Sequence, residues 1–437
     1  MNSLREQLSV DKFRNEKEKQ QGLEAMFHGE KKFLTNGGMG AGFTEEEFCG
    51  AMAEAGFPSV YSAAVPGWKI SQEPAGRQNS NNLREMNAEA IQSAATYLRQ
   101  RCEYAIKGAN FMEMLPSYSD SREEVIKSDA FDVLMLGAGM DEKLPARMAE
   151  ANAELQRREP KRSLYYMPIV SSVLAAKAYY HRYAKRGKQP DSLRVPDGYY
   201  LELPIDEDEN TAGGHLGFSK NRGLDPDAFD PAAILEGIRK FDKTSPVILA
   251  GGVAYRDQIQ KALDMGFDGV SMGTRLLLTR ESGMSDEQII VKYLNELIGI
   301  IVDQNSSTGF WSSRLDVPYT ERTDETMRDA LLKCVNCVGS GCQYRKNREC
   351  PTDETYCIYR DLIKARLGED VGIYFSGGQI VIMRHDSLYT SDGKPYVPTI
   401  EEGLDFTLTH DSPKKPKYSA ETQAGPAAKN PNTPLAS

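Results

Sequence analysis

Long apolar runs are missing from this sequence. No stretch reaches about 18 consecutive apolar residues, which is the length that a membrane-spanning helix needs. The first residues, Met1-Asn-Ser-Leu-Arg-Glu, carry no apolar segment of the signal-peptide type, so the cytoplasm is the expected compartment. Basic residues are not in excess either, because the formal net charge is −10 and charges of both signs are interspersed. This balance argues against nucleic acid or a membrane as partner and favours a soluble enzyme with a small-molecule substrate.

Cysteine is scarce over most of the chain. Only Cys49 and Cys102 lie in the first three hundred residues, within helical patterns where they are expected to be buried small apolar residues. The other five gather in a short stretch: Cys334, Cys337, Cys342, Cys350 and Cys357. In a chain without a secretory signal, metal ligation competes with free thiols as the explanation of such a cluster, and disulfides are not expected.

The 437 residues, 40% of them hydrophobic, are enough for one barrel-sized domain with additions. We expect an N-terminal helical arm over residues 1–30 that is solvated or wrapped on the body, and a TIM barrel over 31–300. A Cys-rich extension of loops, helix and strand follows over 301–410, with a short helix Tyr359–Leu367 and a strand-like Gly372–Ile382. Residues 411–437 are rich in Pro, Ala, Lys and Ser and predict a disordered tail.

The barrel expectation rests on alternating short apolar runs and amphipathic stretches, which indicate a (β/α)8 fold of the α/β class. The expected strands are Lys32–Asn36, Ser59–Ala63, Asn110–Leu115, Val133–Leu136, Leu164–Ile169, Gly198–Leu203, Val247–Ala250 and Gly269–Met272. Apolar residues at helical spacing predict helices at Glu45–Ala55, Leu83–Lys107, Leu144–Arg157, Val173–Tyr183 and Asp257–Met265.

Glycines follow the seventh and eighth of these strands. Gly251 and Gly252 end the seventh, and Gly273 and Thr274 end the eighth. Glycine lets backbone N–H groups approach an anion closely, and the loops after strands seven and eight form the phosphate site of many TIM barrels. The four residues together therefore predict a phosphate site.

Two further segments have chemistry that fits this barrel end. Thr35–Gly42 holds four glycines after the first strand, where the backbone could pack flat against a planar ring. His215 stands between glycines in Thr211-Ala-Gly-Gly-His-Leu-Gly217, after the sixth strand. An imidazole there would suit proton abstraction from an acidic carbon, or proton donation to a substrate after hydride transfer.

These pieces together resemble the nitronate monooxygenase (2-nitropropane dioxygenase) family, FMN-dependent TIM barrels that include flavin-dependent enoyl-acyl-carrier-protein reductases. The matching segments are Asn36-Gly-Gly-Met-Gly, Gly137-Ala-Gly, Pro168-Ile-Val-Ser-Ser, Ala212-Gly-Gly-His-Leu-Gly-Phe-Ser, Ala250-Gly-Gly-Val and Asp268-Gly-Val-Ser-Met-Gly-Thr-Arg. The resemblance implies that FMN contacts Asn36, Gly37, Gly38 and Met39 with its ring system, is also lined by Gly213 and Gly214, and has its phosphate held by Gly251, Gly252, Gly273 and Thr274. His215 then takes the catalytic position.

The C-terminal part resembles a subgroup of the same family that has a cysteine cluster. The resemblance selects Cys334, Cys337, Cys342 and Cys357 as ligands of a [4Fe–4S] cluster, with zinc as the alternative. Three departures stand out: four residues instead of three precede Cys342, Thr211 stands where an acidic or amide residue is common, and Gly309–Arg314 replaces a Gly-x-Pro-Gly-Arg-like stretch. The third departure predicts a different substrate pocket.

Three functions remain open at this point. One is a flavin monooxygenase that oxidises a nitronate, and another is an NAD(P)H-dependent enoyl reductase whose flavin exchanges electrons with an iron–sulfur centre. The last is a flavin-binding subunit of a biosynthetic complex without turnover of its own. A homodimer and a redox or biosynthetic partner protein are left open as partners. A barrel of the IMP dehydrogenase type is disfavoured, because the barrel region has no cysteine nucleophile loop.

Overall fold

The computed structural model describes residues 3–10, 12–40, 42–68, 80–159, 162–185, 196–204, 229–317, 342, 356–368 and 372–413. Eight parallel strands form one sheet in the order β1-β8-β7-β6-β5-β4-β3-β2, which is a nearly closed barrel. The strands are β1 (Phe33–Asn36), β2 (Ser59–Ser62), β3 (Lys107–Met112), β4 (Val133–Gly137), β5 (Tyr165–Val170), β6 (Tyr199–Glu202), β7 (Val247–Ala250) and β8 (Gly269–Met272). The expected (β/α)8 TIM barrel is confirmed.

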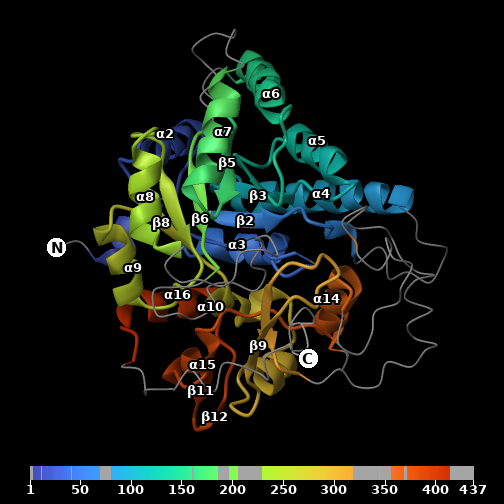
Figure 1. The fold of residues 1–437 in the computed structure, drawn as a ribbon, viewed down its shortest axis with the longest axis vertical. Helices are drawn as coiled ribbons and strands as arrows, with labels where there is room; N and C mark the ends of the chain where they lie inside the picture. Colours follow the sequence, from blue (N-terminus) through green and yellow to red (C-terminus); the bar gives the residue numbers. More distant parts are fainter. Residues whose placement is uncertain are drawn as a thin grey trace, which may run out of the picture.

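Helices cover the outside of this barrel (Figure 1). They follow the strands in turn as α3 (Glu46–Glu54), α4 (Ser80–Cys102), α5 (Tyr118–Ser128), α6 (Leu144–Arg158), α7 (Val173–Lys185), α8 (Pro231–Arg239), α9 (Arg256–Asp264) and the single turn α10 (Thr274–Leu277). No helix among the described residues combines the length and the apolar character that crossing a membrane requires.

The eighth position in the ring of helices around the barrel is occupied by a helix that lies far from β8 in the sequence. Because α10 is only four residues long, it cannot cover β8 by itself. Helix α16 (Ile400–Thr409) packs against both α9 and α3, the helices on either side of that place. Its residues Ile400, Leu404 and Leu408 join the apolar layer between strands and helices. The barrel ring therefore includes a helix that lies more than a hundred residues after β8.

The barrel closes through a side chain at the β1–β2 seam. These two strands are the ends of the sheet order. Asn36, fully buried, donates from Nδ2 to the carbonyl of Val60 (2.8 Å) and accepts at Oδ1 from the N–H of Val60 (2.8 Å). The carboxamide thus pairs with both backbone groups of Val60 in the way a neighbouring strand would.

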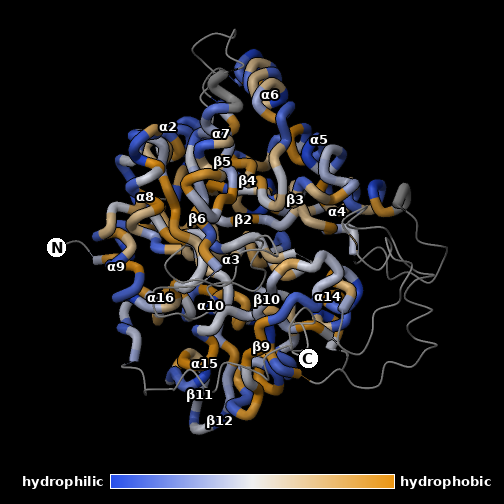
Figure 2. Tube along the Cα trace, in the orientation of Figure 1, coloured by the Kyte–Doolittle hydropathy of each residue, from blue (hydrophilic) through white to orange (hydrophobic). Residues whose placement is uncertain are grey.

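Two apolar layers account for the barrel's packing, and Figure 2 shows the apolar strands surrounded by helices with hydrophilic outer faces. The outer layer lies between strands and helices, and the inner layer fills the barrel. Side chains alternate between the two layers along each strand. In β6, for example, Tyr199 and Leu201 belong to the outer layer and Tyr200 to the inner one.

The N-terminal arm holds α1 (Leu4–Leu8) and α2 (Glu16–Phe27), and α2 closes the barrel end at which the strands begin. Leu23, Met26 and Phe27 join the inner layer, and the ring of Phe27 stacks on Tyr165 with centroids 4.0 Å apart. Of the two alternatives predicted for the arm, wrapping on the body is correct for α2 and solvation is not, because apolar spacing within a charge-rich stretch buries one face of this helix.

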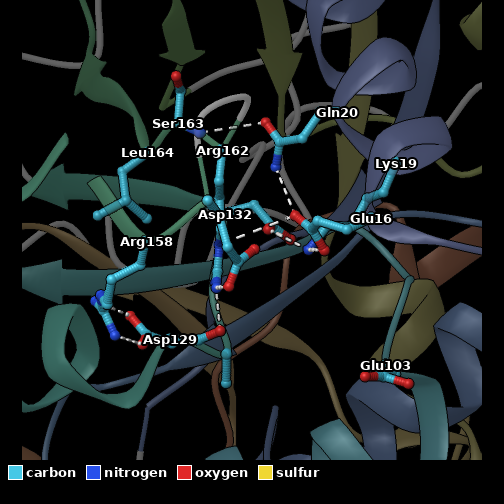
Figure 3. Close-up of polar contacts among 12 residues, drawn as sticks. Glu16, Lys19, Gln20, Glu103, Asp129, Asp132, Arg158, Arg162, Ser163 and Leu164 are labelled. Atoms are coloured by element: carbon cyan, nitrogen blue, oxygen red, sulfur yellow. Dashed lines mark hydrogen bonds and ion pairs between the residues drawn. The ribbon is translucent and has the colours of Figure 1, made fainter. Parts of the chain in front are cut away.

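Charged groups of α2 lie beside the apolar residues with which this helix closes the barrel end (Figure 3). Lys19, 3% exposed, forms an ion pair with the fully buried Asp132 (Nζ–Oδ1 2.8 Å) and a second one with Glu16 (2.9 Å). Burial alone would raise the pKa of Asp132, but Lys19 and Lys107 outweigh it and hold this pKa below its ordinary value. Burial likewise opposes the charge on Lys19, yet its two carboxylate partners raise its pKa.

The C-terminal extension packs on the opposite end of the barrel and to one side of it (Figure 1). It contains the hairpin β9 (Ile300–Asp303) and β10 (Ser312–Leu315), then α14 (Ile358–Leu367), α15 (Ile380–Met383) and η7 (Ser387–Tyr389). Arg275, at the start of α10, is fully buried and forms an ion pair with Asp386 (2.7 Å) and a hydrogen bond to the hydroxyl of Tyr389 (3.1 Å). The end of β8 and the extension therefore share one core.

Most predicted elements agree with the structure within two residues. The third strand differs, because it begins at Lys107 and ends at Met112, and α4 ends at Cys102 instead of continuing to residue 107. Lys107 is buried at this point because its ammonium donates to three carbonyls at the end of α4, a role that periodicity does not indicate.

The predicted strand Gly372–Ile382 is wrong. The segment forms one isolated bridge between Phe375 and Arg314, and then turns into α15. Two adjacent glycines interrupt the apolar run, and the isoleucines that follow them begin the helix. Of the predicted disordered tail, only residues 411–413 lie within the described part of the chain.

Candidate functional site

The carboxyl ends of the strands form the barrel mouth, where TIM barrels carry their active sites. At the end of β7, Gly251 and Gly252 have backbone φ values of +86° and +71°. Residues other than glycine rarely adopt this backbone conformation. At the end of β8, Gly273 has no described atom within 4 Å of the position that a Cβ would take. Because β7 and β8 are paired, the two loops are neighbours with open space beside Gly273.

Thr274 connects this place to the C-terminal extension. Its Oγ1 accepts a hydrogen bond from the N–H of Gly377 (3.0 Å). The segment around Gly377 is held in turn by β10, because Leu315 donates to the carbonyl of Tyr374 (2.9 Å) and Ser376 donates to that of Ser313 (3.2 Å). The threonine hydroxyl keeps its own proton, which it can donate to an anion in the open space.

The loop after β1 lies on the other side of β8. The N–H of Gly37 donates to the carbonyl of Met272 (2.8 Å). A Cβ on Gly38 would lie 2.4 Å from the Cβ of Asn110, so only glycine allows the backbone to pack this closely on β3. The N–H of Met39 donates to Thr44 (3.0 Å), which fixes the turn of the loop. The glycine segment predicted to face a planar ring therefore lies at the mouth, with its backbone packed closely on β3 and β8.

Glu202 at the end of β6 is a site residue that the sequence reading missed. It pairs in register with Ala250 of β7 and follows Tyr200, an inner-layer residue, by two positions, so its side chain points into the barrel mouth. The side chain is accessible from the mouth, yet the surrounding strands remove most of its water, and this desolvation raises the pKa of Glu202 to about 7. A charged residue at an inward position near the end of a barrel strand is the signal that could have identified it.

A second carboxylate lies at the end of β3. Glu113 packs against Gly139, where a Cβ would come within 2.1 Å of its Oε2. Burial, with a contribution from the charge of Asp141, raises the pKa of Glu113. The Gly137-Ala-Gly segment that contains Gly139 includes Ala138 at φ +53°, so this loop too has an uncommon backbone.

Several predicted site residues lie outside the described residues. These are Gly213, Gly214 and His215 of the loop after β6, and Cys334 and Cys337 of the cysteine cluster, together with Cys350. The predicted roles of these residues remain predictions. The described residues at the phosphate loops and the β1 loop are brought together at one barrel end, as expected.

The two described cysteines of the cluster, Cys342 and Cys357, are half-buried and form no disulfide with a described residue. Cys357 precedes α14, and its N–H donates to the carboxylate of Asp361 (2.8 Å) in the first turn. Cys342 and Ile358 pack against the same small apolar cluster beside the mouth. Among the described residues no group of three or more metal-binding side chains is found, so the metal site remains a prediction.

Part of the barrel matches the model of a known protein family. Residues 148–296 match the model of the family described as nitronate monooxygenase, a segment that includes β5 to β8 and both phosphate loops. Over 73 residues the chain is 30% identical to the tryptophan synthase alpha chain of Helicobacter pylori (strain Shi470). That match covers 17% of this chain and 28% of the curated relative.

Three solved structures resemble the chain over 86% of its length. FabK from Thermotoga maritima is 16% identical with a TM-score of 0.52 and 91% of its chain covered. Nitroalkane oxidase from Streptomyces ansochromogenes is 16% identical with a TM-score of 0.53 and 94% covered. The enoyl reductase domain of MlnA from the macrolactin cluster of Bacillus amyloliquefaciens is 12% identical with a TM-score of 0.52 and 92% covered. The chain therefore carries a TIM barrel, and residues 148–296 of that barrel match the nitronate monooxygenase family model.

Proposed function

We propose that this protein is an FMN-dependent oxidoreductase that acts on a small organic substrate at the barrel mouth. The observation that carries the proposal is the pair of glycine loops at the ends of β7 and β8, with open space beside Gly273. Phosphate oxygens need several donors at close range and no side chain in the way, and this place offers both. The family match over the same segment supports FMN as the ligand.

The residues present fit the rest of the cofactor as well. Gly37, Gly38 and Met39 offer a flat backbone against which a ring system could lie, next to the end of β8. The side chain of Asn36 is engaged with Val60, so its contact with the ring would come through its position at the start of this loop. Gly213 and Gly214 would line the ring from the loop after β6.

His215 is the proposed acid/base residue. It follows β6 in sequence, and the loop after a barrel strand opens at the catalytic face. FMN would supply the electron or hydride transfer, while His215 would take a proton from the substrate or give one to it. This division leaves the protein with the tasks of binding, orientation and proton transfer.

Two reaction types fit this assignment. Oxidation of a nitronate is favoured by the family description, and nitroalkane oxidase is among the structures with this fold. Reduction of an activated alkene by NAD(P)H through the flavin is the alternative, and an enoyl reductase domain has the same fold. A [4Fe–4S] cluster at Cys334, Cys337, Cys342 and Cys357, or zinc there, would distinguish this chain further, because only the iron–sulfur centre could exchange electrons with the flavin.

The phosphate assignment is tested with Gly273→Ala. The added methyl group enters open space at φ −110°, so we expect an unchanged melting temperature and at least about a tenfold loss of FMN affinity. The matched control is Gly299→Ala, at an exposed glycine whose Cβ would meet Asp316 at 4.0 Å. Equal FMN affinity in both variants and the wild type would contradict the proposal.

The reaction and the metal are tested on the wild-type protein. The anaerobic absorption spectrum should contain flavin bands, and iron and zinc analysis of the same sample identifies the metal. Steady turnover that is lost in His215→Ala with FMN still bound would exclude a partner subunit without activity. Protein that retains no flavin after gentle purification and does not rebind added FMN would count against the whole assignment.

A further inference from the structure

Glu202 occupies a special position in the barrel. It is the last residue of β6 and lies beside Ala250, the residue that precedes the glycine pair of β7. Its side chain extends from the same strand face as Tyr200, one layer closer to the mouth. A ligand seated on the mouth between the β1 loop and the phosphate loops would therefore have this carboxylate on its barrel side.

The surroundings of Glu202 leave its charge uncompensated. No described residue donates a hydrogen bond to its carboxylate or forms an ion pair with it. The neighbouring strands offer Ile169 and Val170 from β5 and Ala250 from β7, none of which is ionisable. Residues 205–228, which follow directly, lie outside the described residues. With respect to the described residues, desolvation raises the pKa of Glu202 to about 7.

Glu202 is exposed at the mouth, so solvent still reaches its carboxylate. Its inward direction beside the glycine pair of β7 places it where a ligand bound at the mouth would cover it and remove this solvent. Reduced FMN is an anion at neutral pH, since its ring system carries a negative charge after uptake of two electrons and one proton. A neighbouring carboxylate is then driven to take up a proton of its own.

We propose that Glu202 is a second proton-holding residue of this site, which takes a proton from solvent at the mouth when the bound flavin is reduced. The inference rests on the proposed function. NAD(P)H or the organic substrate of the proposed function would supply two electrons and one proton to the flavin, and one further proton from solvent would convert the carboxylate of Glu202 to the carboxylic acid. When the flavin is reoxidised, Glu202 returns this proton, so reduction and proton uptake are linked at one residue.

The test compares the dissociation constants of reduced and oxidised FMN across neutral pH. The ratio of the two constants should rise between about pH 6 and about pH 8 by roughly tenfold more in the wild type than in Glu202→Gln, because only the wild type gains a negative charge next to the reduced ring. Subtraction of the variant's trend removes the titration of the flavin itself and that of His215. The matched control is Glu236→Gln on α8, which removes an equally acidic but exposed carboxylate.

Identical pH trends in the wild type and Glu202→Gln would overturn the inference while leaving the flavin assignment intact. If the wild type binds no FMN at any pH, the proposed function itself fails. A second measurement needs no variant: when the bound flavin is reduced by dithionite at about pH 8 in weak buffer, and the protons released by oxidation of dithionite to sulfite are subtracted with free FMN as the reference, the site should take up more than one proton per flavin. An uptake of one proton or less would also overturn the inference.

Discussion

The two ends of the barrel are built on opposite principles. The end at which the strands begin is closed by α2, filled with apolar side chains and supplied with paired charges such as Lys19 and Asp132. The mouth has glycines with positive φ, open space beside Gly273 and the carboxylate of Glu202, for which no partner is found within the described part of the chain. Groups that stabilise the fold are thus concentrated at one end, and groups suited to a ligand at the other. Substitutions at the two ends should therefore separate stability from FMN binding.

The largest effect is expected from Asp132→Asn at the closed end. Loss of this charge leaves Lys19 with Glu16 as its remaining ion-pair partner and removes the carboxylate that favours the charge of the buried Lys107, which should lower the free energy of unfolding by about 3–5 kcal/mol in urea titrations. FMN affinity of the folded variant should match that of the wild type. The control is Glu236→Gln, whose exposed pair with Lys240 should contribute less than about 1 kcal/mol. A large change in the FMN affinity of Asp132→Asn would contradict the idea that the closed end determines stability and the mouth determines FMN binding.

The same substitution has a pH signature. The pKa of Asp132 is lowered in the folded protein, so its contribution to stability is present above the pKa of the unfolded state and is lost as pH falls through the folded value. The difference in unfolding free energy between the wild type and Asp132→Asn should therefore shrink as pH decreases below about 4. A difference that stays constant across this range would mean that the ion pair is not its origin.

An intermediate effect is expected from Asn36→Leu at the seam. The change leaves the N–H and the carbonyl of Val60 unpaired, so the free energy of unfolding should fall by about 1–3 kcal/mol. Because Asn36 begins the loop predicted to face the flavin, FMN affinity should fall as well. The chain offers a matched control in Asn152→Leu, since Asn152 pairs in the same two-way manner with the backbone of Leu164 before β5, at the closed end. Equal losses of FMN affinity in both variants would show that the effect arises from stability alone.

The smallest effect on stability is expected from Thr274→Val. Loss of the acceptor for the N–H of Gly377 should cost about 1 kcal/mol, and FMN affinity should fall by roughly fivefold to tenfold because the phosphate loses a donor. Thr409→Val serves as control, since that hydroxyl bonds within its own helix. Calorimetric FMN titration measures both variants, and an unchanged affinity in Thr274→Val would remove this residue from the phosphate site.

Much of the barrel could be predicted because its signals are local. Short apolar strands, each ended by glycine or polar residues, are readable one at a time, and β7 and β8 were predicted with the bounds that the structure has. The two phosphate loops follow from the same signals. The start of β3 was misplaced because a buried lysine at position 107 depends on carbonyls of the preceding helix end.

The remainder depends on contacts between distant segments. The role of α16 in the helix ring requires α9 and α3 as neighbours, which nothing within residues 400–409 indicates. The engagement of Thr274 by Gly377 joins residues 103 positions apart. Glu202 was missed for another reason, because a glutamate at a strand end is usually a solvated residue. Its position at the barrel mouth follows only from the register of β6 with β7 and from the inward direction of Tyr200, two residues earlier on the same strand face.

The place of α16 also has a consequence for biosynthesis. The ring closes only when residues 400–409 have been made, and Arg5 of the N-terminal arm forms an ion pair with Asp405 of that helix. A nascent chain that ends after β8 would expose the apolar surface which α16 covers, so completion of the fold must wait until nearly all of the described chain has left the ribosome. Truncated chains that stop near residue 300 should consequently aggregate, even though all eight strands are present.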